Sequence, residues 1–264
     1  MSRAPLVALL LLASTPVLAQ GPVVAPPQRD WQLTLGGSVG FVPKYQGSSN
    51  YELRALPYVD ATYKDLVFVR GLAAGANLVN VRGPRPGDGL RMGPIVRYGF
   101  GREESDDEAL RGLGDIDDAI EAGAFVSYSA GPFLADLTLV KDVADGHDGV
   151  LADAGIAWRV PLTQRMRGSV RASTTWANDT YMSNVFGISA AQSARSGMRV
   201  HDAGAGIKDV GLAFSLSYGL TESWSVSGRV AYSRLLGDAA DSPIVADRGA
   251  KNQVGTFLTV AYGF

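Results

Sequence analysis

Apolar and polar residues alternate along most of the chain between residues 31 and 264, in segments of about ten residues. In residues 210–218, for example, Val210, Leu212 and Phe214 alternate with glycine, alanine and serine. A period of two places successive side chains on opposite faces of a β-strand, one of them apolar. The pattern therefore predicts an all-β protein built from many strands of similar length.

The number of strands is less certain than their existence. We count about eleven alternating segments, but Gly71 and Gly75 break the alternation in residues 66–80, where two strands are easily counted as one. Single-chain barrels of bacterial outer membranes have even strand numbers. For a barrel we therefore expect twelve strands, with ten as the alternative.

The polar faces of the segments carry charged residues. These residues are Arg54, Arg97, Arg159, Arg171 and Arg229, together with Glu121, Asp136 and Asp153. In a soluble β-sandwich such faces meet water, whereas in a membrane barrel they line the lumen and the apolar faces meet lipid. Periodicity does not separate the two architectures. The tryptophans favour the barrel, because Trp31, Trp158, Trp176 and Trp224 all lie near predicted strand ends, where membrane interfaces collect aromatic residues.

Both ends of the chain support the barrel. Residues 1–19 combine Arg3, an apolar stretch and small residues before position 20, which is typical of a cleaved secretory signal. Residues 20–30 contain three prolines and are expected to form an extended periplasmic segment. The last alternating segment ends on Phe264, which suits a closing strand recognised by the barrel assembly machinery. We expect residues 31–264 to form a transmembrane, antiparallel up-and-down β-barrel in the cell outer membrane of a Gram-negative bacterium.

Composition agrees with this class. Charged residues make up 19% of the 264 residues, below the roughly 25% of soluble domains, and 32 residues are glycine. The chain has no cysteine, so disulfide bonds do not stabilise it. The formal net charge of −2 offers no basic surface for nucleic acid. No segment after the signal is long and apolar enough for a helical membrane span.

The lengths of the connections predict an orientation. Residues 130–132, 161–165 and 219–223 are short turns, whereas residues 102–118, 144–149 and 177–203 are long connections. Outer-membrane barrels have short periplasmic turns and longer extracellular loops. The long connections are therefore expected on the outside of the cell.

Candidate chemistry is sparse. Hydrolysis by an activated serine usually needs a histidine, and only His147 and His201 are present, both in predicted outer loops. His147 lies between aspartates and glycines in a segment typical of a turn with glycines at positive φ, and a cation site there is a weaker alternative. His201, beside Asp202, is expected to be a surface residue rather than half of a catalytic dyad. We predict no catalytic, cofactor-binding or metal-binding residues and no cofactor.

Two further motifs were considered as sites. The acidic residues 103–108 predict a solvated loop face, with divalent-cation bridging to lipopolysaccharide phosphates as the alternative. Gly112 and Gly114 lack the third glycine and the strand–helix context of a nucleotide-binding loop. They are not predicted to bind phosphate.

Several segments resemble the MipA/OmpV family of outer-membrane proteins. The resemblance covers most of residues 31–264 in order. The similar segments are residues 43–48 (PKYQGS), 56–57 (LP), 101–102 (GR), 110–117 (LRGLGDID), 175–189 and 235–245 (LLGDAADSPIV). The proline-rich residues 83–88 depart from the family pattern and leave the local strand count open.

The resemblance implies an outer-membrane scaffold that links a lytic transglycosylase to a murein synthase, with porin-like permeability in other members. It supplies no catalytic residues. We therefore expect a non-enzymatic scaffold for periplasmic murein enzymes, in contact with outer-membrane lipid and lipopolysaccharide. The alternative is a narrow porin-like channel, since about twelve strands leave little lumen. An enzyme is the least favoured hypothesis, because of the two isolated histidines.

Overall fold

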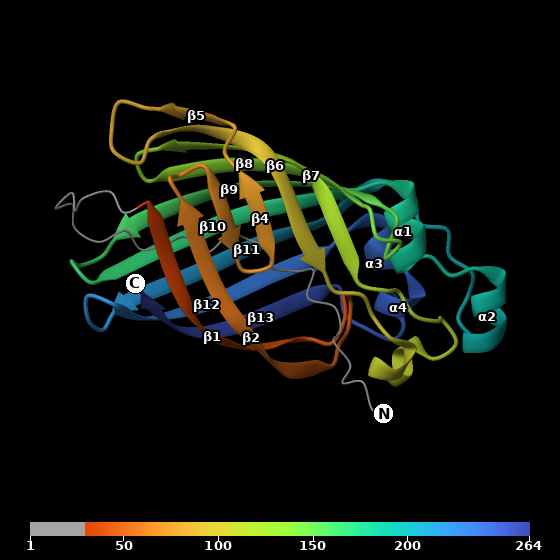
Figure 1. Ribbon diagram of the computed structural model, residues 1–264. Helices are drawn as coiled ribbons and strands as arrows, with labels where there is room; N and C mark the ends of the chain where they lie inside the picture. The colour runs from red at the N-terminus through yellow and green to blue at the C-terminus, as the bar shows by residue number, and fades with distance from the viewer. Residues whose placement is uncertain (1–29) are drawn as a thin grey trace.

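The computed structural model describes residues 30–264, so the predicted signal of residues 1–19 and nearly all of the predicted segment 20–30 lie outside the described residues. The described chain forms one antiparallel sheet that closes on itself (Figure 1). The strands are β1 (Trp31–Pro43), β2 (Tyr51–Tyr63), β3 (Val67–Arg70), β4 (Ala73–Ala76), β5 (Val79–Arg82), β6 (Gly89–Gly99), β7 (Ala119–Ala130), β8 (Phe133–Asp142), β9 (Val150–Pro161), β10 (Met166–Ala177), β11 (Gly206–Gly219), β12 (Trp224–Leu235) and β13 (Asn252–Gly263).

The ring contains twelve wall strands. Consecutive strands pair with each other except β4 and β5, and β1 pairs with β13 to close the ring. Both β4 and β5 pair with β6, through Ala73↔Arg97 and Val79↔Met92, and the register changes by one residue between them. They therefore act as one strand with an irregularity at residues 77–78, so that thirteen strand segments make twelve wall strands. The prediction of twelve is confirmed, and the alternative of ten is wrong.

The region in which two strands could be merged contains a short hairpin. Strands β3 and β4 join through Gly71, whose φ of 55° lies in the left-handed region that glycine adopts without a steric cost. Each strand has only four residues, so the hairpin pairs with just one end of β2. Within the described chain, residues 51–58 of β2 have no ladder partner on that side. The segment after β6 approaches this part of β2, where the Arg54 guanidinium lies 5.7 Å from the ring centre of Phe100.

The outer surface of the ring is apolar. Large side chains such as Leu137, Ile156, Phe214 and Leu258 are exposed there, whereas the opposite faces of the same strands are largely polar or small. In water this belt would be costly, but lipid is its natural solvent. Aromatic residues gather at the strand ends: Trp31 packs on Tyr63, and Trp224 packs on Tyr262. The predicted aromatic girdle is confirmed. Among the described residues, no helix is long and apolar enough to cross a membrane.

The two ends of the barrel differ. At the end that we call the turn end, strands join through residues 64–66, 83–88, 131–132, 162–165 and 220–223. At the opposite end, the loop end, the connections are residues 44–50, 100–118, 143–149, 178–205 and 236–251. The predicted asymmetry of short turns and long loops is confirmed. The proline-rich residues 83–88 form a turn between β5 and β6, and their Asp88 carboxylate accepts a hydrogen bond from the Gly131 amide of the neighbouring turn (2.6 Å).

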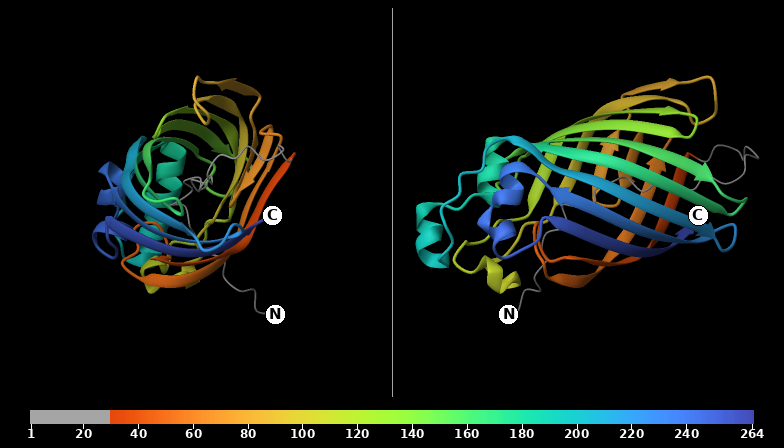
Figure 2. Two further views of the ribbon diagram at one scale, coloured as in Figure 1. Left: turned by 90° about the vertical axis from the view of Figure 1, so that its left-hand side faces the viewer. Right: turned by 180° about the vertical axis from the view of Figure 1, so that it is seen from behind.

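Short helices cover the loop end (Figure 1). They are α1 (Asp179–Phe186), α2 (Ala190–Ser196), α3 (Gly237–Asp241) and α4 (Pro243–Ala246), with the 3-10 turns η1 (Glu104–Asp106) and η2 (Glu108–Leu110). The end-on view in Figure 2 shows α1 within the outline of the ring. The loop end of the lumen is therefore filled by the chain itself.

Candidate functional site

The loops at the loop end share a buried apolar core, the cap cluster. It joins Tyr181, Met182, Val185 and Phe186 of α1 to strand residues that face the lumen and to α3 and α4; the other buried members are Ile95, Val140, Leu151, Ala177, Ala203, Leu235, Ala239 and Val245. Apolar burial of this extent is the main stabilising term in protein cores. The α1 helix is thus held in the mouth of the barrel by the same interaction that holds a soluble domain together.

A second apolar cluster lies farther from the membrane. Its buried members come from four connections, and they are Tyr45, Leu110, Leu113, Ile188, Met198 and Ile244. Burial raises the pKa of the Tyr45 hydroxyl to about 12 and lowers the pKa of Arg102 to about 10. The Arg102 guanidinium donates a hydrogen bond to the Val185 carbonyl (2.8 Å), which ties residues 100–118 to α1.

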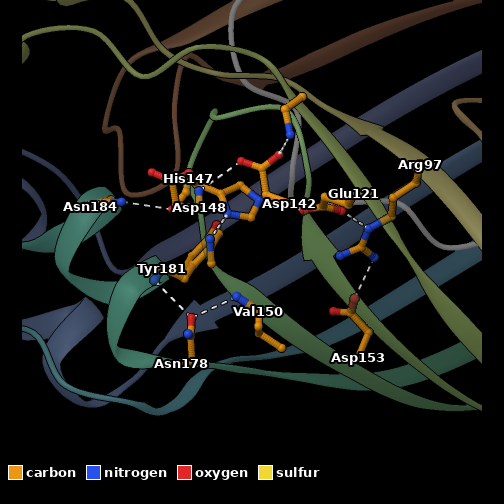
Figure 3. Close-up of polar contacts among 12 residues, drawn as sticks. Arg97, Glu121, Asp142, His147, Asp148, Val150, Asp153, Asn178, Tyr181 and Asn184 are labelled. Carbon is orange, nitrogen blue, oxygen red and sulfur yellow. Dashed lines mark hydrogen bonds and ion pairs between the residues drawn. The ribbon is translucent and has the colours of Figure 1, made fainter.

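Directly beneath the cap, charged side chains from three strands meet across the lumen (Figure 3). The Arg97 guanidinium of β6 donates to the Glu121 carboxylate of β7 and to the Asp153 carboxylate of β9, the latter at 2.6 Å. Glu121 is fully buried. An isolated carboxylate would be expensive in this position, so its partners are required for folding.

His147 completes this network from the loop side. Its Nε2 lies 2.8 Å from the Glu121 carboxylate, and its Nδ1 accepts a hydrogen bond from the Gly149 amide (3.0 Å). Because Nδ1 is an acceptor, the neutral ring carries its proton on Nε2 and donates it to Glu121. The ring packs edge-on against Tyr181, with ring centres 4.7 Å apart. Burial raises the pKa of the Tyr181 hydroxyl.

The loop that carries His147 is a turn, as predicted, but the prediction of its geometry was wrong. The residues at positive φ are Asp145 and Asp148, both at 57°, rather than Gly146 and Gly149. Short polar side chains tolerate this conformation. The Asp142 carboxylate accepts hydrogen bonds from the amides of Ala144 (3.0 Å) and Asp148 (2.9 Å). Gly149 is required for a different reason, since a Cβ there would lie 2.3 Å from the Tyr181 Cβ.

The start of α1 is bonded to the wall. The Asn178 side chain caps the helix by accepting a hydrogen bond from the Tyr181 amide (3.1 Å), and it also accepts one from the Val150 amide of β9 (2.8 Å). On the other side of Tyr181, Lys208 and Asp209 of β11 form a buried ion pair. Both side chains point inward because β10 and β11 change register between Thr175 and Trp176. Sequence reasoning missed this pair, since alternation places adjacent residues on opposite faces.

The acidic residues 103–108 are more ordered than a solvated face. The Glu104 carboxylate accepts hydrogen bonds from the amides of Gly112 (2.7 Å) and Gly114 (2.9 Å), and these bonds hold the pKa of Glu104 below its usual range. Asp107 is buried and accepts a hydrogen bond from the Asn50 side chain (2.7 Å). The prediction of a solvated face is therefore wrong for Asp107, whereas Glu104 remains accessible to solvent.

His201 is bonded within the cap. Its Nε2 lies 2.9 Å from the Asp238 carbonyl, and its backbone pairs with that of Ile188. The neighbouring Asp202 makes no contact with the ring among the hydrogen bonds of the described chain. The geometry thus places His201 in the structure of the loops.

The turn-end half of the lumen is rich in arginine. Arg171 of β10 forms a bidentate ion pair with Asp136 of β8, with N–O distances of 2.5 and 2.6 Å. Arg229 of β12 donates to the Ser215 hydroxyl at 3.4 Å. Arg159 of β9 donates to the Ser129 hydroxyl at 3.3 Å. The lumenal positions predicted for Arg97, Arg159, Arg171 and Arg229, and for Glu121, Asp136 and Asp153, are confirmed by these contacts. Arg54 is also inward, beside Glu52.

The family model for the MltA-interacting protein MipA matches residues 35–264, which is nearly the whole described barrel. The chain belongs to the MltA-interacting protein family. It is 26% identical over 256 residues to the MltA-interacting protein of Escherichia coli (strain K12), covering 96% of this chain and 99% of that protein. The protein of the same name from Shigella flexneri matches to the same extent.

Solved structures with a similar arrangement include the NanC porin, with a TM-score of 0.42 and 9% identity over 86% of this chain and 98% of that one. They also include an outer-membrane channel from Pseudomonas putida F1, with a TM-score of 0.43 and 10% identity over 93% of this chain and 100% of that one. This member of the MltA-interacting protein family is a β-barrel of the Gram-negative outer membrane. In barrels of this class the short turns face the periplasm and the longer loops face outward.

Proposed function

We propose that this protein is a non-enzymatic scaffold that holds an MltA-like lytic transglycosylase, and with it a murein synthase, at the inner surface of the outer membrane. One observation carries the proposal. The cap cluster and the Arg97–Glu121–His147 network fill the outward mouth of the lumen, so the barrel is closed toward the outside. The relatives named above are called MltA-interacting proteins, which supplies the class of partner.

The environments of the two histidines support a non-enzymatic role. Both ring nitrogens of His147 are used, one by Glu121 and one by the Gly149 amide, and the ring is buried beneath Tyr181. A general base must reach the proton that it removes. His201 is bonded to a backbone carbonyl instead of a nucleophile. The membrane belt would meet lipid and lipopolysaccharide, and the barrel assembly machinery would insert the chain.

The partner would bind the periplasmic turn end. The segment from residue 78 to residue 88 is exposed at this end: Leu78 and Val81 are largely accessible, as are Pro84 and Pro86 at its tip. Within the described chain, β5 pairs only with β6, which leaves its other edge open. Open edges of this kind accept a strand from a partner. The turns 161–165 and 219–223 and the segment 20–30 are the other proposed contacts.

Two measurements on one preparation test the proposal. Purified, refolded protein is immobilised and exposed to recombinant MltA-like transglycosylase from the same organism, and the same protein is recorded in planar bilayers. We expect capture of the transglycosylase and little or no steady conductance. Replacing residues 84–86 by Gly-Ser-Gly should weaken capture, whereas the same replacement of the exposed residues 143–145 at the loop end serves as the matched control. A large, steady conductance without capture would favour the porin-like channel.

A further inference from the structure

Three arginines in the turn-end half of the lumen have no carboxylate partner within residues 30–264. Arg159 and Arg229 each donate only to a serine hydroxyl, and Arg167 forms neither a side-chain hydrogen bond nor an ion pair. The Nε atom of Arg229 is buried without any partner in the described chain. All three side chains are only partly exposed to solvent. Removing an unpaired cation from water costs desolvation free energy, and a bound anion would offset that cost.

Strand register places the three arginines around one patch of the wall. Arg229 pairs with Ser215, Ser215 pairs with Ser169, and Ser169 pairs with Arg159, so the four residues form a row across β12, β11, β10 and β9. The row spans three strand spacings, or about 14 Å. Arg167 lies two residues from Ser169 on the same face of β10. Long cationic side chains therefore flank two inward hydroxyls, which is a suitable surface for an anionic group.

The acids nearby are already in use. Asp136 is held by Arg171 through both carboxylate oxygens, and Asp65 pairs with Arg91. The three unpaired arginines thus leave a local excess of positive charge, while the ion-pair network beneath the cap takes up most other lumenal carboxylates. This separation of charge along the lumen is a property of the fold, since the net charge of the whole chain is only −2.

A cavity adjoins Arg229. It has a volume of about 70 Å³, and its charged lining residues are Arg97, Arg171, Lys208 and Arg229 together with Asp153 and Asp209, whereas Arg159 and Arg167 lie outside it. A water molecule occupies about 30 Å³ in the liquid, so the cavity has room for one small group rather than for a sugar ring. Guanidinium groups match the geometry of carboxylate and phosphate oxygens.

We propose that Arg159, Arg167 and Arg229 form a binding site for a carboxylate or phosphate group, which enters the lumen from the periplasm and is held against the Ser169 and Ser215 hydroxyls. The closed loop end makes this a site of binding rather than of passage. The site is independent of the scaffold partner, which would contact the rim of the same end.

Calorimetric titration of refolded protein at low ionic strength tests the site, with inorganic phosphate in one arm and acetate in the other, so that the two chemistries are distinguished. We expect one of the two anions to bind. Arg229→Gln should weaken binding about tenfold to a hundredfold, since a hydrogen bond to a charged group is lost. The matched control is Arg165→Gln, which removes the same charge from the exposed turn 162–165 and should leave binding unchanged.

Stability gives a second readout. Because Arg229→Gln removes an unpaired buried charge, the apo variant should keep the heat-modifiable mobility of a folded barrel and unfold at a temperature equal to or above that of the wild type. Saturating anion should raise the melting temperature of the wild type but not of the variant. The proposal is overturned if neither anion binds, or if Arg165→Gln weakens binding as much as Arg229→Gln does.

Discussion

Leu258→Arg tests whether the apolar belt of the barrel is solvated by lipid. Leu258 is the seventh of twelve residues in β13, between Val39 of β1 and Gly228 of β12, and its side chain is 57% exposed. A membrane strand needs about 9–11 residues, so this position lies near the middle of the bilayer. Arginine on the lipid face costs about 2–4 kcal/mol at this depth and about 0–1 kcal/mol near the interface.

The matched control for this test is Leu162→Arg in the turn between β9 and β10. Leu162 has nearly the same exposure, 53%, but lies at the turn end outside the strands. On a water-facing surface both substitutions would change stability by less than about 0.5 kcal/mol. In a bilayer Leu258→Arg should lower the folding equilibrium about 30-fold or more, while Leu162→Arg should have little effect.

The measurement is a urea titration of the protein in lipid vesicles, followed by tryptophan fluorescence and by heat-modifiable mobility on gels. We expect the unfolding midpoint of Leu258→Arg to fall by about 0.7 M or more, given slopes of about 1–3 kcal/mol/M. Equal midpoints for the two variants would refute the assignment of faces, and with it the membrane barrel.

Three further predictions concern the cap and the network beneath it. Glu121→Ala should destabilise the barrel by about 3–5 kcal/mol in the same titration, because Arg97 and His147 lose a buried partner. The control Asp145→Asn, on the exposed turn, should leave the unfolding midpoint unchanged. Gly149→Ala should push α1 away from the wall and produce intermittent current in planar bilayers. The control Gly206→Ala, whose Cβ would meet nothing within 4 Å, should produce no current. If Gly149→Ala also produced no current, the hypothesis that the cap closes the lumen would be contradicted. The depressed pKa of Glu104 means that its hydrogen bonds stabilise residues 100–118 above about pH 4.5 and that this contribution is lost as the pH falls through the lower, folded-state pKa. The hydrogen-exchange protection factors of the Gly112 and Gly114 amides should therefore fall in acid, and Glu104→Gln should remove that pH dependence.

The strands were predictable because a membrane barrel imposes the same constraint on each of them. Every strand must cross a belt of fixed thickness with one face toward lipid, which gives the segments a common length and a period of two. This constraint is weaker for a strand that does not cross the whole membrane. The hairpin of β3 and β4 has four residues on each side, and β5 continues β4 after an irregularity, so alternation alone could not resolve residues 66–80.

The cap was not predictable from periodicity. Its apolar residues come from separate connections, and none of its helices exceeds eight residues, so no long amphipathic pattern marks it. A weaker signal was present. Glu121 lies on the inner face near the loop end of β7, where a carboxylate needs a partner, and the nearby loop offers His147. Sequence reasoning treated the two residues separately because it assigned His147 to a turn in an outer loop.

The distribution of charge along the lumen connects the two proposals. At the loop end, Glu121, Asp153 and Asp209 are matched to Arg97, His147 and Lys208, and all of these side chains except Asp153 are buried beneath the apolar cap. At the turn end, Arg159, Arg167 and Arg229 have no such partners in the described chain, and in the proposed orientation they face the periplasm. A conducting pore would need charged groups that remain accessible along its whole length, whereas here they are accessible at one end only. A barrel that is closed at its outer end and basic at its periplasmic end is suited to binding on its periplasmic side. If Arg229→Gln lost anion binding but still captured the transglycosylase, the lumen and the rim would be shown to bind independently.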